Sequence, residues 1–189
     1  MALSKNKAWY NKAYISVSVE SGTEIQLRAK TTSLKISGGN YDTEGIETFG
    51  GKIKRVGPRE DLEIGFDGIA TSHQDFDWIF HGLTSSTGSS ITSSTVRDYR
   101  VSILWTDQAS ITTATSAITT ASEAYREIYA EANMVSLEKS MDADNHLTAA
   151  MNFKLAYTDD TGGVNFKKEY SDTTNTLAAV TGYTSTTKF

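Results

Sequence analysis

Four side chains that can bind a metal ion lie close together in one segment: His73, Asp75, Asp77 and His81. Imidazole nitrogens and carboxylate oxygens are common zinc ligands, and the i, i+4 spacing of His73 and Asp77 places both on one face of a helix. Residues 72–75 also fit a helix-capping box that has aspartate at its last position. We therefore favour the interpretation that Asp75 completes the cap and that the other side chains lie on the exposed face of a short amphipathic helix.

A second polar group, Asp142, Asp144 and Asn145, resembles the start of a calcium-binding loop. His146 occupies the fifth position and no glycine follows at the sixth, which excludes an EF-hand. We interpret this segment as a polar turn, with calcium binding as the alternative.

The sequence lacks the common motifs of enzymes and cofactor sites. It has no Gly-x-Ser-x-Gly, and no set of Ser, His and Asp stands out. The pairs Gly38-Gly39 and Gly50-Gly51 are not followed by Lys-Ser/Thr and open no helix, so they indicate turns rather than phosphate loops. The absence of cysteine excludes disulfides and thiolate chemistry. We expect no enzyme and no cofactor.

The charge of the chain limits its partners. The 189 residues carry a formal net charge of -5, so we expect no broad cationic face that could bind nucleic acid tightly. Passing contact with DNA is compatible with this charge. The one basic cluster is Lys52, Lys54, Arg55 and Arg59, which we interpret as a solvated strand face, with partner binding as the alternative. No signal-peptide pattern and no apolar run of about 18 residues occurs, so we expect no membrane contact.

The elements that position these residues are mostly strands, because apolar residues alternate with polar ones. A first hairpin around Gly22 and three further strands are predicted from this alternation. Their apolar positions are Ile15, Val17 and Val19; Ile25, Leu27 and Ala29; Leu34 and Ile36; Leu62, Ile64 and Phe66; and Tyr99, Val101, Ile103 and Trp105.

The most regular alternation runs from Leu147 to Tyr157. The segment before it, from about Tyr125 to Lys139, has mixed periodicity, and its Ala and Glu residues would also suit a helix. We predict that the two segments form a long antiparallel hairpin. A short strand is predicted to begin at Val164 and Phe166.

One helix and several long loops complete the prediction. Phe76, Ile79, Phe80 and Leu83 share a face of a short helix that ends near Gly82 and packs against the sheet. The Ser/Thr-rich stretches 84–95 and 106–122 have little apolar content, so we expect long loops that build no core. The stretch 173–189 is expected to depend on a neighbouring chain for order.

The predicted fold is therefore mainly β: an antiparallel β-sandwich or small barrel with one short α-helix and long loops. The whole chain, 1–189, is predicted to be a single domain with an N-terminal arm, 1–12, and a C-terminal arm, 173–189.

One region resembles a known family. The run from Ile36 to Ile53, ISGGNYDTEGIETFGGKI, continues through Arg59–Ile64 to the helix around Asp75-Phe76-Asp77 and is similar to the tail tube proteins of long-tailed bacteriophages and archaeal viruses. The late strand pair and the turn Asp159-Asp160-Thr161-Gly162 also resemble that family in their order. The similarity covers about residues 12 to 170.

This resemblance implies a homohexameric ring that stacks into a viral tail tube, through which the genome leaves the capsid. The implied partners are further copies of the chain and tape-measure, tail-terminator and tail-tip proteins, with viral DNA bound only non-specifically in transit. The implied location is the virion tail, and the host cytoplasm during assembly.

Two sets of residues would carry such a role. The segment Gly38–Gly51 is predicted to be an irregular loop that reaches an adjacent ring, with Gly39, Tyr41, Ile46, Phe49 and Gly50 as its candidate contact residues. Acidic side chains on strands are candidates for a DNA-repelling channel wall, with a solvated outer surface as the alternative. These side chains are Glu63, Asp67, Glu127 and Glu131.

A second function remains open, that of a β-sandwich carbohydrate-binding or capsid-decoration module. Aromatic side chains could stack on sugar rings, although most of them are expected to fill the core or an interface. The candidates are Trp9, Tyr10, Tyr41, Trp78 and Trp105.

Overall fold

The computed structural model describes residues 13–22, 24–29, 33–69, 75–82, 91, 94–106, 108, 110–119, 123–141, 147–158, 163–172 and 174–183. Ten strands and one helix lie in this part of the chain, which confirms the prediction of a mainly β fold with one short helix. They are β1 (Ala13–Val19), β2 (Glu24–Ala29), β3 (Lys35–Gly38), β4 (Tyr41–Thr48), β5 (Gly51–Arg59), β6 (Leu62–Ile69), α1 (Asp75–Phe80), β7 (Tyr99–Thr106), β8 (Ala124–Ser140), β9 (Thr148–Leu155) and β10 (Phe166–Ser171).

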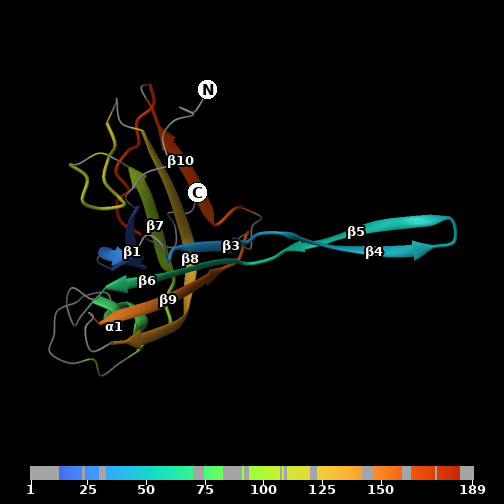
Figure 1. Cartoon of the computed structure of the whole chain (residues 1–189), viewed down its shortest axis with the longest axis horizontal. Coiled ribbons are helices and arrows are strands. Elements are labelled where there is room, and N and C mark those ends of the chain that lie inside the picture. The colour runs from blue at the N-terminus through green and yellow to red at the C-terminus, as the bar shows by residue number, and fades with distance from the viewer. Residues whose placement is uncertain are drawn as a thin grey trace.

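The body of the molecule is an eight-stranded antiparallel sheet in the order β10-β8-β7-β1-β2-β6-β3, in which β9 pairs with both β6 and β8. The 17-residue strand β8 belongs to two layers, because its first half lies between β7 and β10 and its second half pairs with β9. In Figure 1, β3, β6 and β9 run across the direction of β7, β8 and β10. The main core fills the space between these layers.

The strands predicted from alternation are present. β1 and β2 form the first hairpin, with Ile15 opposite Leu27 and Val17 opposite Ile25. The alternating apolar residues of β1, β6, β7 and β9 build one core cluster. At its centre the ring of Phe153 stacks on Phe66 at 5.9 Å and meets Tyr99 edge-on at 5.8 Å.

The predicted long hairpin is confirmed as β8 and β9, which pair from Asn133–Lys154 to Ser140–Thr148. The alanine- and glutamate-rich start of β8 is strand because β7 and β10 pair with it on both sides, and this tertiary pairing overrides helix propensity. The turn residues 142–146 lie outside the described part.

Helix α1 packs against the sheet as predicted, but Phe80, which was predicted to share the packing face, is 43% exposed. Ile79 is fully buried, and its carbonyl accepts a hydrogen bond from the Tyr99 hydroxyl. Gly82 follows the helix with a φ of 64°, a left-handed conformation that glycine adopts easily. The predicted cap residues 72–74 lie outside the described residues, as do Leu83 and the side chain of Phe76.

The expectation that residues 106–122 build no core is wrong for the described part of that stretch. Ile111, Ala114 and Ile118 are buried, and they pack with Leu104 and Leu177 in a second cluster. These few side chains lie among Ser and Thr residues on a path that is neither helix nor regular strand, so periodicity gave no correct indication of their burial.

Residues 174–183 pack on the subunit's own body, so the expectation that this stretch depends on a neighbouring chain is wrong for them. Ile118 and Leu177 exchange two backbone hydrogen bonds of 2.9 and 3.0 Å. The buried guanidinium of Arg126 donates to the Ala178 carbonyl at 2.7 Å, and that of Arg100 donates to the Gly182 carbonyl at 2.7 Å. Residues 184–189 and the predicted arm 1–12 lie outside the described part.

Candidate assembly surface

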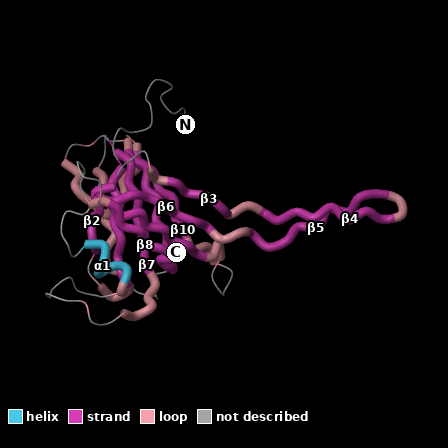
Figure 2. The backbone as a smooth tube through the Cα atoms, turned by 60° about the horizontal axis from the view of Figure 1, so that its bottom comes forward, coloured by secondary structure: helices cyan, strands magenta, loops and turns pink. Residues whose placement is uncertain are grey.

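Strands β4 and β5 form a separate two-stranded sheet that projects from the body as a long hairpin (Figures 1 and 2). The prediction of an irregular loop at Gly38–Gly51 is therefore wrong in detail, because most of that segment is a regular ladder. The pairing runs from Tyr41–Arg59 to Thr48–Gly51, with a bulge between Tyr41 and Thr43 that shifts the alternation. At about 3.3 Å per residue, the nine residues of β5 extend about 30 Å.

The hairpin displays apolar side chains to solvent. Phe49, in the turn, is 111% exposed, and Tyr41 and Val56 on the strands are 54% and 57% exposed. An isolated two-stranded hairpin is at best marginally stable in water, and its open edges can pair with other chains. These features indicate a contact surface.

The two strands of the hairpin carry opposite charges. β4 contains Asp42, Glu44 and Glu47 and no basic residue, whereas β5 contains the predicted basic cluster and no acidic residue. The cluster's Lys52, Lys54 and Arg55 are exposed, as a solvated strand requires. Lys52 pairs with Glu47 at 3.4 Å. The sequence analysis identified the basic cluster but missed the acidic run that mirrors it across Phe49-Gly50.

The base of the hairpin is fixed by Arg59. Its guanidinium lies 4.3 Å from the ring centroid of Tyr41 and 4.1 Å from that of Tyr157, so both rings hold it by cation–π contacts. Next to it, the Glu60 amide donates to the Asn40 carbonyl at 2.8 Å. Gly38 has a φ of 95° and lies against the backbone of Asp61. The direction in which the hairpin leaves the body is therefore determined by its first and last residues.

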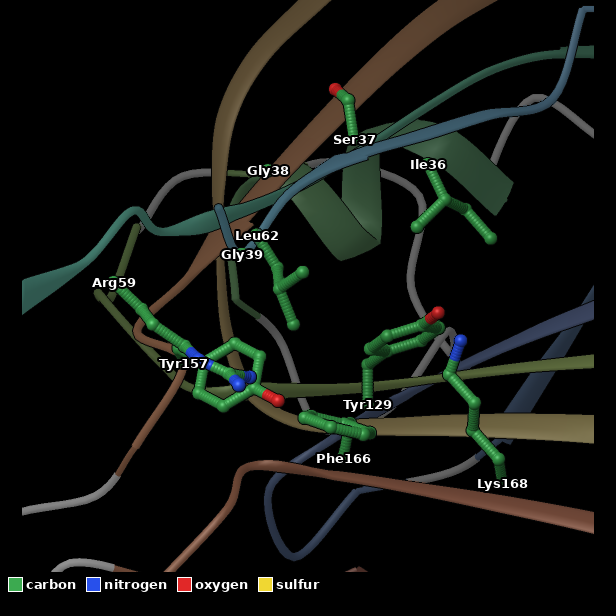
Figure 3. A pocket seen from close by; sticks show the side chains of 10 residues that line it. All are labelled: Ile36, Ser37, Gly38, Gly39, Arg59, Leu62, Tyr129, Tyr157, Phe166 and Lys168. Atoms are coloured by element: carbon green, nitrogen blue, oxygen red, sulfur yellow. The ribbon is translucent and has the colours of Figure 1, made fainter. Parts of the chain in front are cut away.

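A cavity of about 410 Å³ opens beside this base (Figure 3). Its walls include the rings of Tyr129, Tyr157 and Phe166, with Tyr157 and Phe166 in edge-on contact at 5.1 Å. Arg59 and Lys168 also lie in these walls, and the ammonium of Lys168 pairs with Glu127. The surface that the cavity offers to a binding partner is therefore mainly aromatic, with the Arg59 guanidinium beside it.

Glu127, a candidate for the channel wall, is buried at 5% exposure, which contradicts the solvent-facing position expected from alternation. Its carboxylate accepts hydrogen bonds from the hydroxyls of Tyr125 at 2.6 Å and Tyr129 at 2.8 Å and pairs with Lys168 at 2.7 Å. Burial, together with this carboxylate, raises the pKa of both tyrosines. The carboxylate is thus already neutralised within the subunit.

The other three acidic candidates differ in exposure. Glu63 is exposed on β6, and its Oε1 atom lies 3.9 Å from Nζ of Lys154. Asp67, four residues further along the same face of β6, is half-buried. Glu131 is half-buried and has a φ of 55° near the point where β8 passes between layers. Their position at a channel stays a prediction.

The suggested metal and sugar sites gain no support from geometry. Asp77 pairs with Lys139, and no group of three metal-binding side chains occurs among the described residues. His73, the side chain of Asp75 and the acidic turn 142–145 lie outside the described part. Trp105 stacks on Tyr125 at 5.4 Å rather than forming an open platform. Trp9, Tyr10 and the side chain of Trp78 are likewise not described.

In the described part of the chain, no helix is long and apolar enough to span a membrane.

No protein-family model matches the sequence, and no curated protein matches it either. One solved structure with a TM-score above 0.5 shares the fold, and two further structures are less similar. A chain in the sixfold-symmetrised cryo-EM structure of the anti-feeding prophage baseplate is 7% identical over 92% of this chain and 100% of its own length, with a TM-score of 0.53. A chain of the anti-feeding prophage tube-terminating cap is 14% identical over 90% and 95%, with a TM-score of 0.48. A sheath/tube terminator chain of an extracellular contractile injection system is 17% identical over 82% and 92%, with a TM-score of 0.44.

Proposed function

We propose that this chain is a non-enzymatic structural subunit that assembles with copies of itself into homohexameric rings, which stack into a tail tube for genome delivery. Contacts with tape-measure, tail-terminator and tail-tip proteins belong to the same proposal. So do a place in the virion tail and assembly in the host cytoplasm.

The observation that carries this proposal is the projecting hairpin. It extends away from the core, exposes Phe49 and Val56, and leaves the outer edges of β4 and β5 without a partner strand in the described structure. A monomer gains nothing from such an element, since it is marginally stable and prone to aggregate. A second copy that covers it would bury the apolar side chains and pair the edges.

The fold supports the same proposal. The baseplate chain of the anti-feeding prophage, which has the same fold, was solved in a sixfold-symmetrised assembly. At 7% identity the likeness concerns the fold, and the sixfold ring of this chain is our inference from it. A closed ring also suits a heterologous contact in which one surface of a copy meets a different surface of the next.

The proposed channel would have an acidic wall. With a net charge of -5, a wall built from this subunit would repel phosphate groups, so DNA would pass without being held. Glu63 is the acidic candidate with the greatest described exposure.

The experiment shortens the hairpin without removing its base. Residues 45–54 are replaced by Asn-Gly, because Glu44 and Arg55 are paired and a two-residue type I′ turn can join them. We expect the variant to keep its β-rich circular dichroism spectrum and to sediment as a monomer, while the unmodified chain forms rings or tubes in electron micrographs.

The matched control is Val96→Ser, which removes an exposed apolar side chain far along the chain from the hairpin. It should assemble normally. Tubes formed by the shortened variant would contradict the role of the hairpin. An unmodified chain that stays monomeric at high concentration and binds glycans would instead support the binding-module alternative.

A further inference from the structure

We infer that hairpins of neighbouring copies pair edge to edge, with the acidic strand β4 of one copy beside the basic strand β5 of the next, so that the ring carries a continuous collar of antiparallel strands. This inference rests on the proposed function and specifies its subunit contact.

The first support is the pairing state of the hairpin. β4 and β5 pair only with each other in the described structure, so each has one outer edge of backbone N–H and C=O groups with no strand beside it. Edge pairing would satisfy these groups with main-chain hydrogen bonds, which is the usual way in which one chain extends the sheet of another.

The second support is the separation of charge. β4 has three acidic and no basic residues, and β5 has four basic and no acidic residues. Contact between unlike edges therefore brings opposite charges together, whereas contact between two β4 edges or two β5 edges brings like charges together. Like charges directly opposite destabilise strand pairing, so the sequence selects unlike edges and disfavours a twofold dimer.

The third support is symmetry. β4 runs away from the body and β5 returns to it, as the arrows in Figure 1 show. If copies are related by rotation about an axis along the hairpins, the β5 edge of one copy lies beside the β4 edge of the next, and the two strands are antiparallel. Rotation thus produces the same unlike, head-to-tail contact that the charges favour, and such a contact closes into a ring.

The charges specify the neighbour more than they provide affinity. Exposed ion pairs such as Glu47–Lys52 contribute little, because water and salt screen them. The affinity would come from main-chain hydrogen bonds and from covering Val56 and Tyr41, which are more than half exposed. Assembly should therefore survive moderate salt, while the discrimination against like edges weakens.

The test uses cysteine pairs, which is straightforward because the chain has no cysteine of its own. Thr43 and Val56 are exposed, uncharged and at the same height in the hairpin, since they are partners in the ladder. We prepare Thr43→Cys and Val56→Cys as separate proteins, assemble each alone and both together, and oxidise them. A disulfide needs Cα atoms about 4.4–6.8 Å apart, so only adjacent strands react.

We expect crosslinked dimers in the mixture and none in either variant alone. A tilted hairpin could shift the register between β4 of one copy and β5 of the next. The same mixing is therefore done with Gly45→Cys and Lys54→Cys and with Glu47→Cys and Lys52→Cys, and each β4 variant is also mixed with each of the other β5 variants. Homodimers in a single variant would mean that like edges meet and would overturn the inference. Rings without any crosslink between a β4 and a β5 cysteine would also overturn it while leaving the proposed function intact.

Charge reversal provides an independent test. An acidic hairpin, in which only Arg59 at the base stays basic, is made by Lys52→Glu, Lys54→Glu and Arg55→Glu, and an all-basic one by Asp42→Lys, Glu44→Lys and Glu47→Lys. Each alone places like charges at every contact and should not assemble, whereas an equal mixture should form rings in which the two variants alternate. If the mixture stays as unassembled as its components, edge pairing is wrong. If the unmodified chain forms no rings at all, it is the proposed function that fails.

Discussion

At Gly38 the backbone determines which residue is allowed. Its φ is 95°, and a Cβ atom added there would lie 2.0 Å from the carbonyl oxygen of Asp61. We expect Gly38→Ala to lower the free energy of unfolding by about 1–3 kcal/mol, because strain and the clash act together. Urea unfolding followed by circular dichroism measures this. Gly45→Ala is the control, since nothing lies within 4 Å of an added Cβ, and an equal loss in both variants would contradict the argument.

Glu169 provides a pH-dependent contact at the residue scale. Burial disfavours its charged form, but hydrogen bonds from Lys167 and Arg126 and their positive charges outweigh this and hold the pKa of the carboxyl below its usual value. The contact therefore stabilises the fold above about pH 4.3, the ordinary glutamate pKa, and its contribution is lost as the pH falls through the lower folded pKa.

We expect the unfolding free energy of the unmodified protein to fall more between pH 5 and pH 3 than that of Glu169→Gln, which cannot ionise. Denaturant titrations at several pH values measure the difference. Lys167→Ala should lie between the two, because Arg126 still bonds the carboxylate with its Nε and Nη2 atoms at 3.0 and 2.7 Å. Parallel pH profiles for all three would show that this carboxyl does not titrate differently in the folded state.

At the scale of elements, strand β9 has one face in the core and the other in solvent. Met151 and Phe153 are fully buried, while Asn152 between them is exposed. We expect Met151→Asp or Phe153→Asp to prevent folding, because a carboxylate buried without a partner costs several kcal/mol. Asn152→Asp adds the same charge to the same strand and should yield folded protein. Soluble, cooperatively unfolding Phe153→Asp would show that β9 does not face the core.

The strands were predictable from the sequence because their apolar residues alternate, but the burial of the polar residues between them was not. β1 and β7 were predicted in this way although residues on both of their faces are buried. β6 and β9 alternate cleanly, so their residues were assigned correctly. In β8, residues 126–130 are all buried, because the main core covers one face and residues 111–118 and 174–183 cover the other. Alternation therefore could not indicate that Glu127 is internal. The hairpin was mistaken for a loop because five glycines suggested irregularity, whereas the ladder needs only the pair at its turn.

At the scale of the whole molecule, the proposed channel predicts a functional rather than a structural effect of one charge. Glu63 is exposed on β6, and the core does not depend on it. In a sixfold ring, Glu63→Lys changes the local charge by about twelve units, which could turn a repelling wall into one that retains DNA. We expect normal tubes but delayed DNA release at low salt, with recovery as screening increases.

Release is followed by a dye that binds free DNA, on particles carrying the variant subunit. Glu138→Lys serves as the control, because it introduces the same charge change at an exposed position of β8. Normal release by Glu63→Lys at low salt would remove β6 from the channel wall, and an equal delay in both variants would point to total charge rather than position.

The turn at the end of the hairpin also offers a way to stop the assembly of subunits. Phe49 and Gly50 form the exposed turn between β4 and β5, at the tip of the projecting hairpin, and exposed loop tips are sites where proteases cut readily. A subunit nicked there would keep its core, because none of the described hairpin side chains belongs to either buried cluster. It could still enter a ring through its intact surfaces, but its two hairpin strands would no longer be joined at the tip and would pair less well with the next copies. Partial digestion should therefore interrupt the closure of rings, and a small fraction of nicked copies would affect many rings, because each proposed ring takes six subunits.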